Sequence, residues 1–339
     1  MIAAGESGTL PGGPAAQGAH TRFELFFGNF QLRPPVPRGM PTRILTATAL
    51  VLLGCVACHP GNIEAKRLRT ACDRGNVTAC DTLAVKLQKG EYVLRDETHA
   101  AELFDVACKG GVGDGCASLG LAYQKGTGVK KDSVRAMTLL DQGCTRGGMD
   151  GCTALGVLYR RGTGVTRDPA RAATLFQRSC DGGNLTGCAH LGATYAAGEG
   201  LPQDYARAAD LLQRSCTAKV QLGCVGLGRL HAAGTGVPHN DSTAAALYDK
   251  ACDAAEPTGC FERAGMFEAG TGAAQNFTRA GELYRQACEL GHGESCARLA
   301  ALYDRGAGVR RNPERAAEFR KRACDAGYTE SCAKPKAAS

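Results

Sequence analysis

Apolar residues recur along most of the chain with the spacing of one helical face. Cys116, Leu119, Gly120 and Tyr123 occupy positions i, i+3, i+4 and i+7, which share one side of an α-helix. The same residue types return at the same spacing from Cys152 onward. Because a glycine inside a helix costs ~1 kcal/mol relative to alanine, its recurrence predicts that the backbone of a neighbouring helix comes close there.

A second helix is predicted after each of these first helices. The first helix ends at a Gly-x-Gly sequence, whose first glycine suits a left-handed C-cap. In one unit Asp168 precedes Pro169, and Ala172, Phe176 and Cys180 form the apolar face of the second helix. An Asp or Asn stands at the same N-cap place in every unit: Asp96, Asp132, Asp168, Asp204, Asn240, Asn276 and Asn312.

Two other features recur around the second helices. Arginines near their start, such as Arg135 and Arg315, are expected to be structural because they repeat. Glycine closes the second helix in most units, but Lys219 and Ala255 stand at that position in two of them. Only glycine adopts a positive φ without steric cost, so we expect the loops 217–222 and 253–258 to differ.

The cysteines give the period of the chain. Sixteen of the 18 form C-x7-C pairs that follow one another every 36 residues, which predicts a solenoid of stacked helix pairs. The units are 73–108, 109–144, 145–180, 181–216, 217–252, 253–288 and 289–324. The pairs are Cys72 and Cys80, Cys108 and Cys116, Cys144 and Cys152, Cys180 and Cys188, Cys216 and Cys224, Cys252 and Cys260, Cys288 and Cys296, and Cys324 and Cys332.

Each pair is predicted to form a disulfide between the end of one helix and the start of the next. Closing such a short loop stabilises the fold by ~2.5 kcal/mol in the chain-entropy model. The alternative is zinc held by four cysteines, but the pairs lack the C-x-x-C spacing and the histidines of zinc sites, and an exported chain favours oxidation. We therefore expect no metal site and no cofactor.

These residues resemble a known family. The pattern Cys-x-x-Gly-x-x-x-x-Cys-x-x-Leu-Gly-x-x-Tyr-x-x-Gly-x-Gly-Val, followed by Arg-Ala-Ala-x-Leu-Phe, is similar to the Sel1-like repeat, a relative of the tetratricopeptide repeat. With C-x7-C in every unit it is similar to the Helicobacter cysteine-rich protein group. The resemblance covers about 62–334 and implies an all-α, right-handed αα-solenoid of seven disulfide-stapled repeats. Tyr92 in place of a loop glycine, and Arg263-Ala264 in place of Leu-Gly, predict poorer packing in two units.

The segment before the repeats has the composition of an export signal. The apolar stretch 44–57 is too short to span a bilayer but suits a signal peptide. It ends in Leu-Leu-Gly-Cys55, which resembles a bacterial lipobox, so Cys55 is the expected lipidation site and Cys58 the second choice. We expect 40–58 to be the signal and 1–39 to be a gene-model extension or disordered; a buried apolar helix is the alternative. Residues 335–339 form a short tail.

Two motifs suggest other functions. Cys55, Cys58 and His59 spell C-x-x-C-H, which leaves a c-type haem carrier as an alternative. The cysteine-rich family is described as penicillin-binding or weakly β-lactamase-like, which implies β-lactam hydrolysis as a further alternative. Ser331 and Lys334 fit S-x-x-K, but S-D-N and K-T-G are absent, so chance is the favoured interpretation and no catalytic residue is predicted.

The net charge and the solenoid architecture bear on the kind of partner. A net charge of +7 over 339 residues is mild and gives no reason to expect nucleic acid binding. The chain is interpreted as an exported cell-envelope scaffold, lipid-anchored in the outer membrane or periplasm, that binds another protein or a cell-wall component through a concave solenoid surface. For its basic side chains a solvated helix face is the favoured interpretation, and a specific basic site that meets an acidic partner is the alternative. The candidate surface residues are Lys86, Lys89, Lys125, Arg160 and Arg161.

Overall fold

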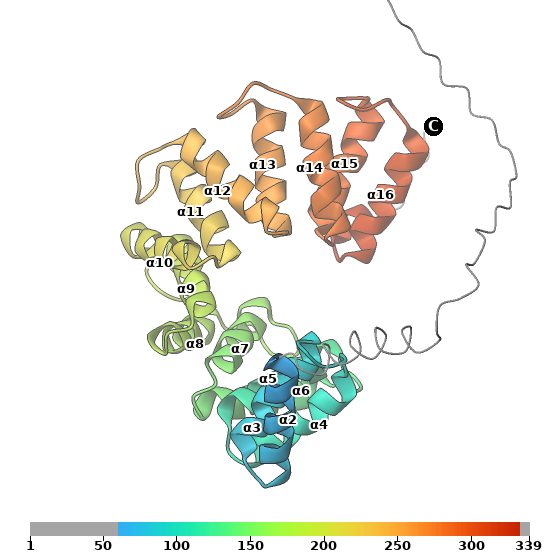
Figure 1. The fold of residues 1–339 in the computed structure, drawn as a ribbon. Coiled ribbons are helices and arrows are strands. Elements are labelled where there is room, and N and C mark those ends of the chain that lie inside the picture. The colour runs from blue at the N-terminus through green and yellow to red at the C-terminus, as the bar shows by residue number, and fades with distance from the viewer. Residues whose placement is uncertain (1–59, 333–339) are drawn as a thin grey trace, which may run out of the picture. The chain divides into compact units, whose positions relative to one another are not determined.

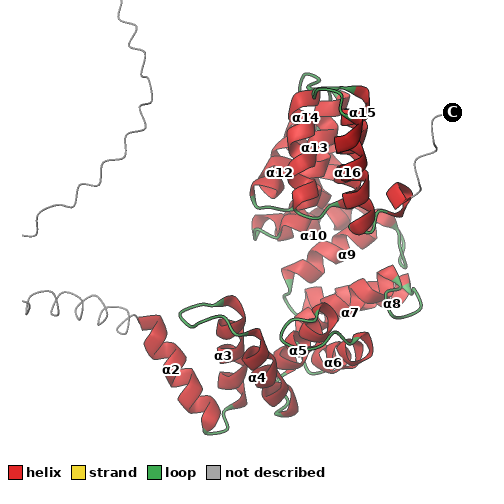
Figure 2. Cartoon of the chain, turned by 90° about the vertical axis from the view of Figure 1, so that its right-hand side faces the viewer, coloured by secondary structure: helices red, strands yellow, loops and turns green. Residues whose placement is uncertain are grey.

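The computed structural model describes residues 60–332, which contain 15 α-helices, one closing 3-10 turn and no strand (Figures 1 and 2). Helix α2 (Pro60–Asp73) precedes the first unit. The first helices of the units are α3 (Val77–Lys89), α5 (Gly113–Lys125), α7 (Met149–Arg161), α9 (Leu185–Ala197), α11 (Gln221–Ala233), α13 (Pro257–Ala269) and α15 (Gly293–Arg305). The second helices are α4 (Glu97–Lys109), α6 (Ser133–Thr145), α8 (Pro169–Asp181), α10 (Tyr205–Thr217), α12 (Asp241–Asp253), α14 (Phe277–Glu289) and α16 (Pro313–Asp325), followed by the turn η1 (Thr329–Cys332).

Each helix packs against the next one along the chain, which confirms the predicted solenoid. Successive first helices also contact one another, as α5 does with α7 and α9 with α11, whereas successive second helices are more widely separated. Hollows of about 720 and 660 Å³ lie between α8 and α10 and between α12 and α14. The first helices are therefore packed more closely along the stack than the second helices.

Helix ends follow the capping chemistry that the sequence predicts. Gly162 ends α7 with φ +70°, and its N–H donates to the Leu158 carbonyl at 2.8 Å. The Asp168 carboxylate accepts a hydrogen bond from the Arg171 backbone N–H at 2.9 Å and begins α8. All seven expected N-cap side chains accept such a bond. The two-helix unit is thus confirmed.

The glycine inside the first helix makes room for a large side chain of the second helix. A Cβ on Gly156 would lie 2.6 Å from the Phe176 ring, and one on Gly228 would lie 2.6 Å from the Tyr248 ring. Both aromatic side chains are buried in the core. In these two units an aromatic ring fills the space instead of the expected backbone. The expectation is confirmed at Gly120 and Gly192, where a Cβ would lie 3.1 and 3.2 Å from the carbonyl oxygens of Ala136 and Ala208.

The loops at Lys219 and Ala255 keep the backbone of the other units. Lys219 has φ +65° and Ala255 has φ +60°, close to the conformation of the glycines that they replace. The next N–H still returns to the helix, since Val220 donates to Ser215 at 2.9 Å. The expectation that these loops differ was wrong, because two non-glycine residues accept the left-handed conformation.

In the first unit a tyrosine stands at the position of the second loop glycine, and a glycine stands opposite it in the helix. Elsewhere the second loop glycine lies against the preceding second helix, so that a Cβ on Gly128 would meet the Glu97 carbonyl oxygen at 2.0 Å. Tyr92 replaces that glycine with φ +60°. A Cβ on Gly61 of α2 would lie 2.2 Å from the Tyr92 ring, so the glycine that gives room has moved to the helix.

The recurrent arginines stabilise their own units. Arg135 donates a hydrogen bond to the Tyr123 hydroxyl at 2.9 Å, and Arg315 donates to the Tyr303 hydroxyl at 3.1 Å. In each unit the bond joins the start of the second helix to the end of the first. Arg171 and Arg207 lie against the equivalent Tyr159 and Tyr195, whereas Arg279 pairs with Glu282 of its own helix. The structural role expected from repetition is therefore confirmed for every recurrent arginine except Arg279.

Several predictions fall outside the described residues. These are the lipidation sites Cys55 and Cys58, the haem motif that ends at His59, the signal segment 40–58 and the tail 335–339. Within residues 60–332 no helix is both long enough and apolar enough to cross a membrane.

Candidate functional site on the first-helix face

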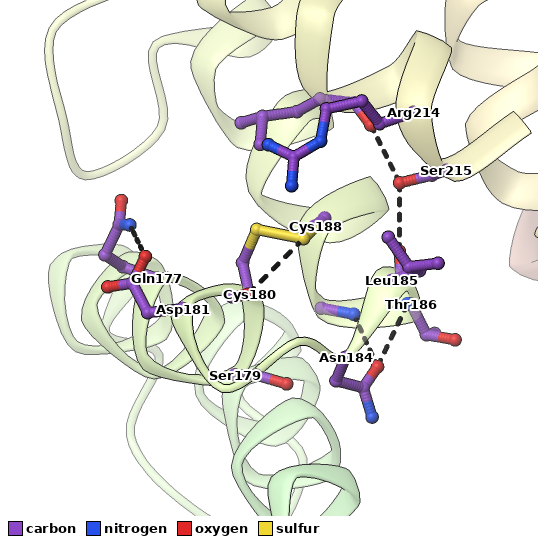
Figure 3. Close-up of a disulfide and its surroundings, with 12 residues drawn as sticks. Gln177, Ser179, Cys180, Asp181, Asn184, Leu185, Thr186, Cys188, Arg214 and Ser215 are labelled. Atoms are coloured by element: carbon purple, nitrogen blue, oxygen red, sulfur yellow. Dashed lines mark hydrogen bonds between the residues drawn. A yellow bond between two sulfur atoms is a disulfide. The ribbon is translucent and has the colours of Figure 1, made fainter. Parts of the chain in front are cut away.

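The eight predicted disulfides are all present, with Cα atoms 4.4–4.9 Å apart. Figure 3 shows Cys180 at the end of α8 bonded to Cys188 in the first turn of α9. Beside this disulfide the Asn184 side chain caps α9, and the Ser215 hydroxyl of α10 donates to the Leu185 carbonyl at 3.0 Å. Bonded cysteines offer no thiolate to a metal or substrate, so these residues build the scaffold rather than a reactive site.

One side of every first helix remains open to solvent. In α5 this side carries Asp114, Ser118, Leu121 and Lys125, which are exposed or half-buried and spaced by four, three and four residues. The equivalent residues of the other units form the same column pattern. We call this surface the first-helix face. The repeating Leu, Gly and Cys residues lie on the opposite, buried side.

The middle of the first-helix face has small side chains. Helix α9 presents Ala193, Ala196 and Ala197, and α11 presents Ala233. None of these positions carries a formal charge. The middle units therefore offer backbone and methyl groups to a partner, with little side-chain bulk.

Cations on the C-terminal part of the face are paired with carboxylates. Arg229 of α11 donates through Nε to Glu262 of α13 at 2.7 Å. Arg305 of α15 donates to Glu268 of α13 at 3.0 Å, and the same carboxylate accepts the Tyr284 hydroxyl at 2.8 Å. Each pair joins two neighbouring units, so these side chains help hold the stack together.

Cations on the N-terminal part of the face have no such partner. Within residues 60–332, Lys125, Arg160 and Arg161 form no ion pair. They lie in the last turns of the adjacent helices α5 and α7. Cations are favourable there because the C-terminal end of a helix carries partial negative charge.

An aromatic stack supports Arg160. Its guanidinium lies 5.5 Å from the centroid of the Phe176 ring, and that ring stacks on the His190 imidazole at 4.9 Å. Burial and the charges of Arg160 and Arg161 lower the pKa of His190 to about 4, so this imidazole is neutral at pH 7. Burial and the charge of Arg161 lower the pKa of Arg160 as well, while the charge of Glu199 opposes that shift.

The structure separates the five predicted surface residues. Lys125, Arg160 and Arg161 lie together on the first-helix face. Lys89 is exposed and pairs with Glu91 at 3.7 Å. Lys86 is different: its side chain is only 13% exposed, it pairs with Glu64 of α2 at 3.4 Å, and it lies 5.8 Å from the centroid of the Tyr92 ring.

A row of carboxylates that the sequence analysis missed lies near the N-terminal ends of the early first helices. Burial, and then the charge of Asp114, raise the pKa of Asp81 to about 6. Burial, and then the charge of Asp150, raise the pKa of Asp114. Asp150 in turn accepts a hydrogen bond from the Asn184 amide at 2.6 Å. Aligning the repeats would have revealed the row, since Asp114 and Asp150 occupy one position.

The described residues add no support for β-lactam hydrolysis or for a metal site. Ser331 lies in η1, next to Cys332, which is bonded to Cys324, while Lys334 lies outside the described residues. Residues 60–332 contain no group of three or more His, Cys, Asp or Glu side chains placed to hold a metal ion.

Two solved structures share the fold of this chain, and a third is similar over a shorter stretch. A protective antigen of uropathogenic Escherichia coli, c5321, which displays an SLR fold, is 26% identical, with a TM-score of 0.51 over 79% of this chain and 57% of that one. A Sel1 repeat protein from Oxalobacter formigenes is 21% identical, with a TM-score of 0.53 over 79% and 78%. Helicobacter pylori cysteine rich protein B is 24% identical over 40% and 97%, with a TM-score of 0.32.

This chain thus spans little more than half the length of the c5321 antigen. No curated protein sequence matches it. Eight disulfides indicate an extracytoplasmic protein, because such bonds do not persist in a reducing cytoplasm. Sel1 repeat proteins typically mediate interactions with other proteins.

The family model assigns every unit. The Sel1 repeat model matches residues 83–112, 113–148, 150–184, 186–220, 221–255, 257–292 and 293–328. These matches cover most of the chain, and each contains one first helix or most of one. The resemblance drawn from the sequence is confirmed, and the chain belongs to the Sel1 repeat family.

Proposed function

We propose that this chain is an exported scaffold of the cell envelope that binds a partner protein through the first-helix face. This proposal is supported by the contrast between the buried and the open residues of each first helix. The repeating Leu, Gly and Cys are buried in packing between units, whereas the open positions change from unit to unit in size and charge. Variable side chains on a constant backbone are what recognition by a repeat protein requires.

Site-specific photocrosslinking tests this use of the surface. A benzophenone amino acid is placed in the full chain at first-helix positions Lys125, Ala197 and Ala269, and at the exposed second-helix positions Thr174 and Gln213 as controls. We expect a partner adduct from the first set and none from the second. Adducts from the second-helix positions alone, or from no position, would contradict the proposal.

We further propose that the scaffold is tethered by a lipid on Cys55, with translation starting at Met40. The lipobox-like Leu-Leu-Gly-Cys and the apolar stretch before it support this, and several acyl chains on one cysteine anchor a protein firmly. Val56 follows the cysteine, a residue that suits outer-membrane delivery by resemblance to other lipoproteins. Labelled palmitate is expected in the wild type and in Cys58→Ala but not in Cys55→Ala. A mature protein that retains residues 1–39 would refute this N-terminal assignment.

A further inference from the structure

The repeats provide an internal comparison for the unpaired cations. Arg161 and Arg305 occupy the same position in α7 and α15, at the exposed end of the first helix. Arg305 pairs at 3.0 Å with Glu268, which lies in the preceding first helix. The residue that corresponds to Glu268 one unit before Arg161 is Gln124. A neutral amide therefore stands where the later unit supplies a carboxylate.

The same substitution occurs one unit earlier. Lys125 precedes Arg161 by one repeat, and the residue in the partner position for Lys125 is Gln88. Leu140 occupies the place of Tyr284, whose hydroxyl donates to Glu268 in the later unit. The early units thus keep the cations of this contact and lack the groups that would complete it within the chain.

Arg160 adds a third cation that is already positioned. Its guanidinium lies against Phe176, and Phe176 is held by the stacked His190 ring. A guanidinium fixed by packing loses little further freedom when it binds. Its half-buried setting also weakens the screening of its charge by water.

We propose that Lys125, Arg160 and Arg161 bind the carboxylates of an extended acidic segment of the partner protein; the proposal rests on the first-helix face being the binding surface. The occupant is identified by charge complementarity with the missing carboxylates. Guanidinium groups favour carboxylates because two N–H groups can meet two oxygens.

The spacing of the helices sets the register of that segment. Packed helices lie about 8–10 Å apart, so Lys125 and Arg161 present charges at about that interval. A polyproline II helix has three residues per turn and a rise of about 3.1 Å, which puts every third side chain on one side about 9 Å apart. The segment that fits therefore carries acidic residues at i and i+3.

The neighbouring surface accommodates the rest of such a segment. Beyond α7 the first-helix face continues over Ala193 and Ala197 of α9, whose small side chains leave room for a peptide backbone. The charged contact lies at one end of this stretch and the paired Arg229 lies at the other. Among the first helices of residues 60–332, lysines and arginines without an ion pair occur only in α5 and α7. The acidic residues therefore belong at one end of the bound segment.

The test uses synthetic peptides and the full chain. The probe is Glu-Pro-Pro-Glu-Pro-Pro-Glu with a fluorescent label, and its controls are the same peptide with Gln for Glu and the rearranged peptide Glu-Glu-Glu-Pro-Pro-Pro-Pro. Fluorescence anisotropy at low salt is expected to give a Kd at least fivefold lower for the probe than for either control. Binding should weaken steeply above 0.1 M salt, where charges are screened within about 10 Å.

Two variants test whether Lys125 and Arg161 bind the probe peptide. Lys125→Gln with Arg161→Gln should raise the Kd about tenfold or more. Gln124→Glu gives Arg161 the internal partner that Arg305 has, and should raise the Kd about threefold or more. Its matched control is Gln213→Glu on the exposed side of α10, which changes the net charge equally and should leave the Kd unchanged. Circular dichroism must show unchanged helicity in each variant.

The outcomes separate the inference from the proposed function. No binding by the probe, equal binding of the rearranged peptide, or equal loss in Gln213→Glu would overturn the inference. Tighter binding of a single-stranded oligonucleotide of the same charge would also overturn it, since phosphate rather than carboxylate would then be preferred. Crosslinks at Ala197 and Ala269 could still support the scaffold, because those positions lie outside the basic contact.

Discussion

Replacing Lys219 by glycine should stabilise the protein, because the backbone there already has the conformation that glycine favours. Lys219 has φ +65°, and a non-glycine residue in the left-handed region costs roughly 1–2 kcal/mol. Glycine loses more entropy on folding, which offsets about 0.5–1 kcal/mol of that gain. We expect Lys219→Gly to increase the free energy of unfolding by about 0.5–1 kcal/mol, and Ala255→Gly to do the same.

The chain supplies its own controls for this effect. Lys219→Ala removes the long side chain but keeps the strained φ, so it should change stability by less than about 0.5 kcal/mol. Gly183 has φ +85° at the same position of another loop, and a Cβ there would meet no atom within 4 Å. Gly183→Ala should therefore cost about 1 kcal/mol through its backbone conformation alone.

The assay must resolve a small shift. Unfolding entropy of about 2.1 cal/mol/K per residue over the 273 described residues, 60–332, means that 1 kcal/mol moves Tm by only about 2 °C. Differential scanning calorimetry with intact disulfides should rank Lys219→Gly above the wild type and Gly183→Ala below it. If Lys219→Ala stabilised as much as Lys219→Gly, the side chain and not φ would be responsible, and the reasoning would fail.

Three further predictions follow from buried groups and close contacts. The pKa of His190 is lowered from 6.5 to about 4 in the folded protein, so between these pH values the unfolded chain binds a proton that the folded protein does not. The free energy of unfolding, measured by chemical denaturation, should therefore fall by on the order of 3 kcal/mol from pH 6.5 to pH 4. His190→Gln should remove this pH dependence. Asp81, with its pKa raised to about 6, has the opposite sign, so Asp81→Asn should stabilise at pH 7 and have no effect at pH 3. Gly61→Ala should lower the free energy of unfolding by about 1–3 kcal/mol through overpacking against Tyr92. In a double-mutant cycle, adding Tyr92→Gly should restore most of that stability. If the effects of the two substitutions were simply additive, the contact would be disproved.

The regular parts of the fold could be predicted because each rests on local chemistry. A carboxylate or amide at the N-cap, such as Asp168, acts on the backbone three residues away, and each disulfide closes a loop within one turn between helices. These interactions need no knowledge of distant units. Because the pattern repeats every 36 residues, a departure in one unit does not hide it. The period and the helix pairs can therefore be predicted from the sequence alone.

The exceptions depended on contacts between units. Tyr92 breaks the loop pattern, and only its neighbour Gly61 in α2 explains how the chain accommodates it. Lys86 seemed a surface residue because of its charge, yet Leu158 and Leu230 occupy its position in other units and are buried. Aligning the units column by column would have placed Lys86 in the core, so this signal was present in the sequence.

The ion pairs of the candidate site also could not be predicted from the sequence, because they join different units. Arg161 and Gln124 lie in different units, and the sequence does not show that their positions face each other. The observed bond between Arg305 and Glu268 supplies that fact, and it then applies to every unit by repetition. One contact in one unit thus shows which of the exposed charges lack a partner in the others.

The stapled architecture explains how unpaired cations can persist on one face. In a solenoid each unit contacts only its neighbours, so stability is nearly a sum of local terms. Every unit here has a disulfide worth ~2.5 kcal/mol in the chain-entropy model in addition to its small core. In the ion pairs of Arg229 and Arg305 the arginine side chains are more than half exposed, while Glu262 and Glu268 are only 23% and 20% exposed. Pairs that remain open to water on one side contribute about 0–1 kcal/mol each. Losing such a pair in the early units therefore costs less than one disulfide supplies, and the first-helix face is free to change its charges without loss of the fold.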